Sequence, residues 1–242
     1  MYFVGIDLAW GERSPTGLAV ADDGGRLVYL AAARDDADIV AQLAPYTAGA
    51  ALLAIDAPLV VTNPTGNRPC EAALNRDFRA LEAGCHPSNT GQPWFAGGGR
   101  GARLADALGR PAIEVYPHAA TVALFELAKT LKYKQKRGRD VAQLRGELLR
   151  LMSLVESLAD AVPPLDARQH AGWAGLREAV RTATRKSELR RAEDPVDAVV
   201  CAYVALFATR RPADVTAYGD DATGCIVTPA LSRTGPPGEW GR

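Results

Sequence analysis

The chain has 242 residues, of which 48% are hydrophobic and 23% charged, as is ordinary for a globular protein with a full core. Its formal net charge is zero, so the overall field neither indicates nor excludes a polyanionic partner. No apolar run reaches the roughly 18 residues of a membrane-spanning helix, and the first residues run straight into a strand rather than a cleavable leader. We therefore expect one domain over 1–242, no membrane association and a cytoplasmic location.

The first third of the chain predicts an antiparallel meander followed by a buried strand. Asp22-Asp23-Gly24-Gly25 is typical of a hairpin, because glycine adopts positive φ at little cost. Asp35 or Asp36 can cap a following helix. The fourth strand is wholly apolar, which favours a central position in a mixed sheet with both faces buried. The elements expected here are strands at 2–8, 17–21, 27–32 and 51–56 and a helix over about 37–46.

Two stretches read as insertions, roughly 62–110 and 132–190. The first contains the glycine run 97–101, which we interpret as a mobile loop because it lacks the phosphate-loop pattern and follows no strand. A strand at 112–116 lies between the insertions. Helices are expected at 69–83, 119–131, 140–160 and 167–187.

The last clear element is a helix over about 195–208. Asp194 as its cap and Pro195 at its first position form a clear start signal. Apolar residues recur along it at spacings of three and four, so one face is expected to pack on the sheet. These residues are Val196, Val199, Val200, Tyr203, Val204 and Phe207.

Acidic residues end three of the strand-like runs and open the final helix. Ionised acids at the ends of buried strands are costly unless a cation meets them, and no lysine or arginine is adjacent in sequence to the three strand acids. Converging hard oxygen ligands are typical of a magnesium or manganese site. We therefore predict that Mg²⁺ or Mn²⁺ is bound by Asp7, Asp56, Glu114, Asp194 and Asp197.

Each of these residues also has a purely structural interpretation. Asp7 could bond its own backbone in a turn, and Glu114 could lie on a solvated face of its strand. Asp194 and Asp197 could simply stabilise the start of the final helix. His118, just past the fifth strand, could protonate a leaving group or steady a phosphate, or be a structural histidine.

A basic run follows at 132–139. Such runs are often solvated faces, but a polyanionic substrate near the acids would make phosphate contacts plausible. The residues predicted to contact nucleic acid are Lys132, Lys134, Lys136, Arg137 and Arg76. The cysteines show no C-x-x-C spacing, and we expect reduced thiols rather than a zinc site or disulfides.

Four segments in chain order resemble a known family. They are Gly5-Ile6-Asp7-Leu8-Ala9-Trp10, Ala54-Ile55-Asp56-Ala57-Pro58-Leu59, Ile113-Glu114-Val115-Tyr116-Pro117-His118-Ala119 and Asp194-Pro195-Val196-Asp197-Ala198-Val199-Val200-Cys201-Ala202-Tyr203. They resemble the predicted nucleases grouped as domain of unknown function 429, which are placed in the ribonuclease H-like superfamily.

This resemblance implies an α/β fold: a ribonuclease H-like five-stranded mixed sheet flanked by helices, with an acidic cluster at one end. It also implies that two divalent metals are bound by Asp7, Asp56 and Asp197. The D-x-x-D spacing of the final helix is similar to that of Holliday-junction resolvases, which adds Asp194. Glu114 belongs to the pattern of the family rather than to the superfamily core.

The leading hypothesis is a divalent-metal-dependent nuclease with Asp7, Asp56, Glu114, Asp197 and His118 as catalytic residues. One alternative is a non-catalytic nucleic-acid-binding module that kept the fold. Another is a phosphotransferase of the actin-like or sugar-kinase type, although such enzymes need two phosphate-binding hairpins and the chain shows no second one.

Overall fold

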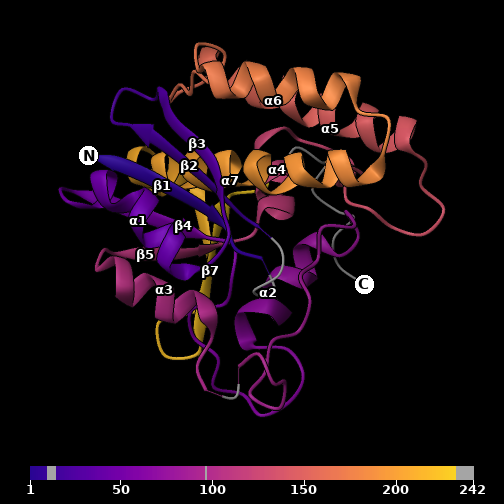
Figure 1. The fold of residues 1–242 in the computed structure, drawn as a ribbon. Coiled ribbons are helices and arrows are strands. Elements are labelled where there is room, and N and C mark those ends of the chain that lie inside the picture. Colours follow the sequence, from indigo (N-terminus) through magenta and orange to yellow (C-terminus); the bar gives the residue numbers. More distant parts are fainter. Residues whose placement is uncertain (10–14, 96, 233–242) are drawn as a thin grey trace.

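A mixed seven-stranded sheet forms the centre of the protein in the computed structural model, which describes residues 1–9, 15–95 and 97–232 (Figure 1). The strand order is β3-β2-β1-β4-β5-β7-β6. Strands β1, β4, β5 and β7 run parallel, whereas β2, β3 and β6 run against their neighbours. The strands are β1 (Tyr2–Asp7), β2 (Thr16–Asp22), β3 (Leu27–Ala33), β4 (Ala51–Ile55), β5 (Ala112–Val115), β6 (Val215–Asp220) and β7 (Gly224–Pro229).

All five expected strands are present and adjacent, but the expected number of five is wrong because β7 and β6 extend the sheet beyond β5. Most residues of β6 are at least partly exposed, and its sequence has no apolar run from which a strand could be predicted. Gly219 and Gly224, both with φ near +100°, flank the turn that joins these two strands. The hairpin expected at residues 22–25 is confirmed between β2 and β3.

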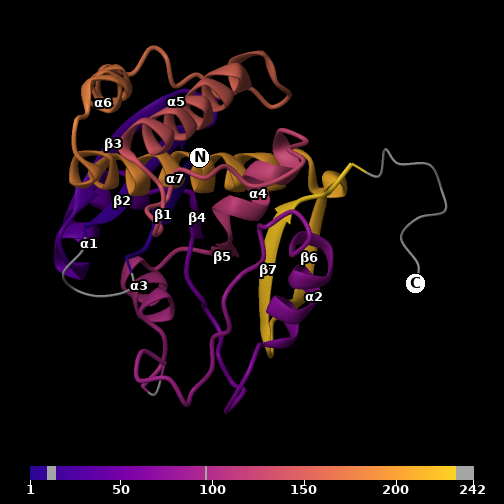
Figure 2. The same cartoon turned by 90° about the vertical axis from the view of Figure 1, so that its right-hand side faces the viewer.

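Helices cover both faces of the sheet (Figure 2). On one face, α7 crosses β1, β2 and β4, and α5 and α6 cover α7 in turn. On the other face, α1 and α3 pack over the first four strands. The helices are α1 (Asp36–Thr47), α2 (Pro69–Phe78), α3 (Arg100–Leu108), α4 (Pro117–Leu124), α5 (Val141–Ser157), α6 (Ala171–Thr182) and α7 (Lys186–Arg210). None of the helices in the described residues combines the length and apolar composition needed to cross a bilayer.

The start predicted for the final helix at Pro195 is wrong. Helix α7 begins at Lys186, where Arg185 and Glu188 form its cap, and Pro195 lies inside it. Residues 195–206 are buried all round, because α7 is enclosed by the sheet on one side and by α5 and α6 on the other. A helix in this position is stabilised by packing on both sides, which outweighs the local stop signal of one proline.

Two glycines let α7 approach the sheet closely. A Cβ at Gly5 of β1 would lie 2.0 Å from the carbonyl oxygen of Ala198, and a Cβ at Gly17 of β2 would lie 2.0 Å from that of Asp194. Only a residue without a side chain permits such contact between backbones.

The other differences concern the insertions. The glycine run does not end in a loop: Gly99 precedes α3, which the sequence analysis missed. Helix α4 starts earlier than expected, at Pro117, and ends at Leu124. The first predicted insertion contains α2 and α3, and the second contains α5 and α6.

Candidate active site at the ends of strands β1 and β4

Two aspartates lie side by side because their strands are parallel neighbours. Asp7 is the last residue of β1, and Asp56 directly follows β4. Ile6 pairs with Ile55 in the sheet, and the Asp56 amide donates to the Ile6 carbonyl at 2.8 Å. The carboxyl ends of both strands therefore present an acid at the same edge of the sheet.

Helix α7 adds two more acids above this edge. Asp194 and Asp197 are one turn apart, and the backbone of Asp194 rests on Gly17, the sheet partner of Asp7. Because α7 begins at Lys186, both acids lie well inside the helix, so the predicted capping role of Asp194 is wrong. They gain nothing from the positive end of the helix dipole, which fades within the first turn.

One ammonium group lies among these acids. Lys134 Nζ is 2.6 Å from Asp197 Oδ2, 3.3 Å from Asp194 Oδ1 and 3.5 Å from Asp7 Oδ2. Lys134 follows Tyr133, whose buried hydroxyl donates to Asp197 Oδ1 at 2.7 Å. Both oxygens of Asp197 are thus engaged by neighbouring residues of one loop between α4 and α5.

The family can be assigned with this geometry in view. The family model described as "Protein of unknown function (DUF429)" matches residues 5–223. The chain belongs to this family. The match runs from β1 to the turn before β7 and includes all four aspartates. No curated protein and no solved structure matches this DUF429 protein.

The site of the DUF429 protein carries more negative charge than Lys134 can balance. Burial, with Asp197 and Asp56 close by, raises the pKa of Asp7 well above its ordinary value, although Lys134 opposes this. Burial and the charge of Asp197 raise the pKa of Asp56 to about 7. Asp7 and Asp56 therefore bind protons more readily than ordinary aspartates, and the excess of acids over ammonium groups among the described residues favours uptake of protons or of another cation.

The donor chemistry fits a hard divalent cation. Asp7 is only 7% exposed, and its Oδ2 accepts no hydrogen bond from the described residues. Asp7, Asp56 and Asp197 offer the carboxylate oxygens that Mg²⁺ and Mn²⁺ prefer. Within the described residues, no three histidine, cysteine or acidic side chains already stand in metal-binding geometry. The Lys134 ammonium lies where Asp7, Asp194 and Asp197 approach one another, so it occupies the space between three of the four carboxylates.

Glu114 has different partners from the aspartates. It pairs with Ile55 in the sheet, one residue before Asp56, but its carboxylate turns to Arg68. Arg68 Nη2 and Nη1 lie 2.5 and 2.9 Å from its two oxygens, and the Leu59 amide donates to Oε2 at 3.0 Å. With both oxygens engaged in this way, Glu114 supports the segment after Asp56, and its predicted role as a metal ligand is not supported by these contacts.

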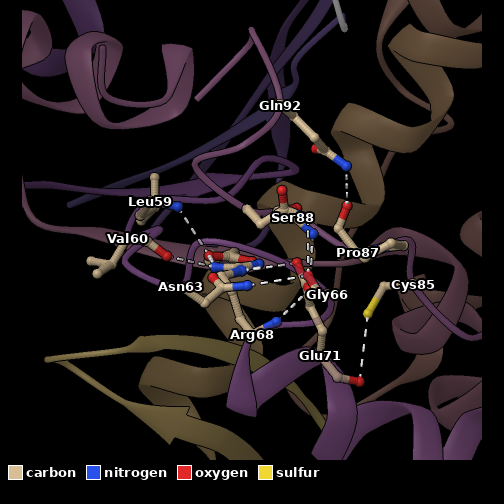
Figure 3. Close-up of polar contacts among 12 residues, drawn as sticks. Leu59, Val60, Asn63, Gly66, Arg68, Glu71, Cys85, Pro87, Ser88 and Gln92 are labelled. Atoms are coloured by element: carbon tan, nitrogen blue, oxygen red, sulfur yellow. Dashed lines mark hydrogen bonds and ion pairs between the residues drawn. The ribbon is translucent and has the colours of Figure 1, made fainter. Parts of the chain in front are cut away.

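Arg68 is the centre of a buried polar network. It is 1% exposed, and it also binds Glu71 through Nε at 2.8 Å and the Val60 carbonyl through Nη1 at 3.0 Å. Burial alone would lower the pKa of Arg68, yet the Glu114 carboxylate holds it above its ordinary value. Glu71 accepts in addition from the Ser88 amide at 3.0 Å. The network ties the loops around residues 60 and 88 to β5 and α2 (Figure 3).

Among the described residues, Tyr133 links His118 to the aspartates. Its Nδ1 lies 3.2 Å from Thr130 Oγ1 and 3.5 Å from the Tyr133 hydroxyl. Burial lowers the pKa of His118 to about 4, so the ring is neutral near pH 7. The predicted role as a general acid would therefore need a neutral ring N–H rather than an imidazolium.

The other basic residues that were predicted to contact nucleic acid lie away from the aspartates or at the surface. Lys132 pairs with Glu82, Lys136 and Arg137 are exposed in the same loop, and Arg76 is exposed on α2, which packs on β6 and β7. Two supporting residues are visible in the sequence, Tyr133 as the aromatic within the basic run and Arg68 as an arginine of the first insertion, but their partners Asp197 and Glu114 are not. Glu193 of α7, which is 5% exposed beside Asp194 in the sequence, has no sequence signal that marks it as part of this region.

Proposed function

We propose that this DUF429 protein is a divalent-metal-dependent nuclease, built on a ribonuclease H-like fold, that hydrolyses phosphodiester bonds. The observation that carries the proposal is the meeting of Asp7, Asp56, Asp194 and Asp197 at one edge of the sheet, where Lys134 is the one ammonium group of the described residues that lies among them. Acids so placed repel a phosphate unless a cation intervenes. In a site that only bound nucleic acid, these carboxylates would weaken binding by repelling the phosphates.

The fold is consistent with the proposal. The three-stranded meander β1–β3 continues into the parallel strands β4 and β5, and helices lie on both faces. The acids stand at the end of the first strand, after the fourth strand and on the long helix α7. These are the positions that the ribonuclease H-like resemblance implies.

Three groups of residues have different roles in the proposed reaction. Asp7, Asp56 and Asp197 would hold Mg²⁺ or Mn²⁺, with Asp194 as a further ligand. The bound cation would activate a water molecule and stabilise the leaving oxygen. Tyr133 orients Asp197 through its hydroxyl, and Arg68 with Glu114 holds the segment that follows Asp56. Lys136 and Arg137, exposed beside Lys134, would contact the phosphate backbone.

A non-catalytic nucleic-acid-binding module is the second candidate. Two observations favour it: Lys134 already forms an ion pair with Asp197, and the described residues contain no group of side chains in metal-binding geometry. Such a module would bind nucleic acid equally well with and without chelator. Its binding would also survive the loss of Asp7.

The test is cleavage of labelled single-stranded, duplex, hybrid and branched nucleic acids with Mg²⁺ or Mn²⁺ and with chelator. We expect metal-dependent cleavage of at least one substrate by the wild type and by the control Asp106→Asn, which changes an exposed acid of α3. Asp7→Asn should be folded and inactive. No cleavage of any substrate, or cleavage that survives both chelator and Asp7→Asn, would overturn the proposal.

A further inference from the structure

The backbone around Lys134 is fixed by hydrogen bonds of Arg139 and of Tyr133. The carbonyl groups of Lys132 and Lys134 accept hydrogen bonds from Arg139 Nη1 at 3.3 and 2.7 Å, which fixes the backbone of this segment. Tyr133 between them is buried and bonded to Asp197. The Lys134 side chain is 29% exposed, so its ammonium group borders the solvent while it contacts the acids.

The ammonium group and a divalent cation would need the same oxygen atoms. Asp197 Oδ2 lies 2.6 Å from Lys134 Nζ, and Oδ1 already accepts from Tyr133. Asp7 Oδ2 accepts no hydrogen bond from the described residues, and its ion pair with Nζ is the longest of the three, at 3.5 Å. A divalent ion at these oxygens would sit within a few ångströms of the ammonium group, where like charges repel strongly at a partly buried site.

We propose that Lys134 is a built-in cation that occupies the acidic site of the metal-free protein, competes with the divalent ion for Asp197, and is displaced when that ion binds. This inference rests on the metal site of the proposed function. The displaced ammonium remains tethered beside the site through Tyr133 and Arg139. It then becomes available to an oxygen of the substrate phosphate, so metal loading would prepare the site for its anionic substrate.

The same competition gives Lys134 a structural task. Without it, no cation of the described residues would lie within ion-pair distance of Asp7, Asp194 and Asp197. The metal-free protein should therefore depend on Lys134 for stability, whereas the metal-bound protein should not. If Lys134 served only to contact nucleic acid, its loss would not lower the stability of the metal-free protein relative to the metal-bound protein.

Calorimetric titration of the whole chain with MnCl₂ tests the inference. We expect Lys134→Met to bind Mn²⁺ at least tenfold more tightly than the wild type. Lys129→Met, a matched change at an exposed lysine outside the site, should bind as the wild type does. Lys134→Arg, which keeps the charge, should not gain affinity. In thermal unfolding without metal, the Tm of Lys134→Met should lie below that of the wild type. At saturating Mn²⁺ the two Tm values should be equal.

Equal or weaker Mn²⁺ binding by Lys134→Met, with clear binding by the wild type, would overturn this inference and leave the proposed function intact. No binding to either protein would overturn both. A measurement on the wild type alone covers the case in which the variant does not fold: reductive methylation of lysines followed by mass spectrometry. Bound Mn²⁺ should raise the modification of Lys134 several-fold relative to Lys136, and an unchanged ratio would refute displacement.

Discussion

Gly17 of β2 lies directly against the backbone of Asp194 in α7, so closely that a Cβ there would be 2.0 Å from the Asp194 carbonyl oxygen. Gly17 is also the antiparallel partner of Asp7. This contact therefore fixes the distance between the end of β1 and the turn of α7 that carries Asp194 and Asp197. A residue with no side chain determines how closely the acids of strand and helix approach each other.

Gly17→Ala should lower the free energy of unfolding by about 1–3 kcal/mol, because the atoms it would strike belong to a backbone that cannot rotate away. Urea denaturation measures the effect. Gly146→Ala is the matched control, since Gly146 is exposed within α5 with nothing near its Cβ position, and it should stabilise the protein by up to about 1 kcal/mol. Equal effects of the two substitutions would refute the close contact.

The first four strands and α1 could be predicted because their signals are local. Alternating or wholly apolar runs, the glycine turn at 24–25 and the Asp35 cap all lie within a few residues of the elements they define. The start of α7 could not be predicted in the same way. Asp194-Pro195 resembles a helix start, but burial between the sheet and two other helices lets α7 continue through Pro195.

The acids at the strand ends were also predictable, because parallel strands deliver their final residues to one edge. Their counter-charges were not. Lys134 meets Asp194 across 60 residues of sequence, and Arg68 meets Glu114 across 46. The absence of an adjacent lysine or arginine favours a metal ion as the counter-charge, whereas folding brings in part of the positive charge from far along the chain.

The acid sensitivity of the fold should depend on His118. Its pKa is about 4 in the folded protein and near 6.5 when unfolded. Between these values the unfolded chain binds more protons, so stability falls as the pH drops from 6.5 to 4. His118→Gln should remove about 2 kcal/mol of this loss. Denaturant midpoints across this range measure it, with exposed His86→Gln as the control, and parallel curves for all three proteins would contradict the prediction.

Glu193 should destabilise the fold at alkaline pH. It is 5% exposed, and burial raises its pKa from 4.5 to about 7. Between these values the folded protein binds more protons than the unfolded chain, so stability falls as the pH rises from 4.5 to 7 and stays lower above it. Glu193→Gln should stabilise the protein by on the order of 2 kcal/mol at pH 8 and have little effect at pH 4.

Asp106→Asn, at an exposed position, is the control for this change and should have little effect at either pH. Chemical denaturation at the two pH values is the measurement. An equal effect of Glu193→Gln at pH 4 and pH 8 would show that the carboxyl group is not held neutral by the fold.

Removing Arg68 should be costly because two buried carboxylates would lose their counter-charge. Arg68→Met should lower the free energy of unfolding by about 3–5 kcal/mol. Adding Glu114→Gln should recover part of this loss, since the double variant buries one charge fewer. Arg181→Met breaks an exposed pair on α6 and should cost at most about 0.5 kcal/mol. A double variant no more stable than Arg68→Met would contradict the account of this network.

We propose that the acids at the ends of β1 and β4 and on α7 form a divalent-cation site. Crystals grown with millimolar MnCl₂ and measured by anomalous diffraction would show it. We expect a manganese peak in contact with the carboxylates of Asp7, Asp56 and Asp197, with the Lys134 ammonium withdrawn from Asp197. No peak at these carboxylates, with Lys134 still bound to Asp197, would contradict it.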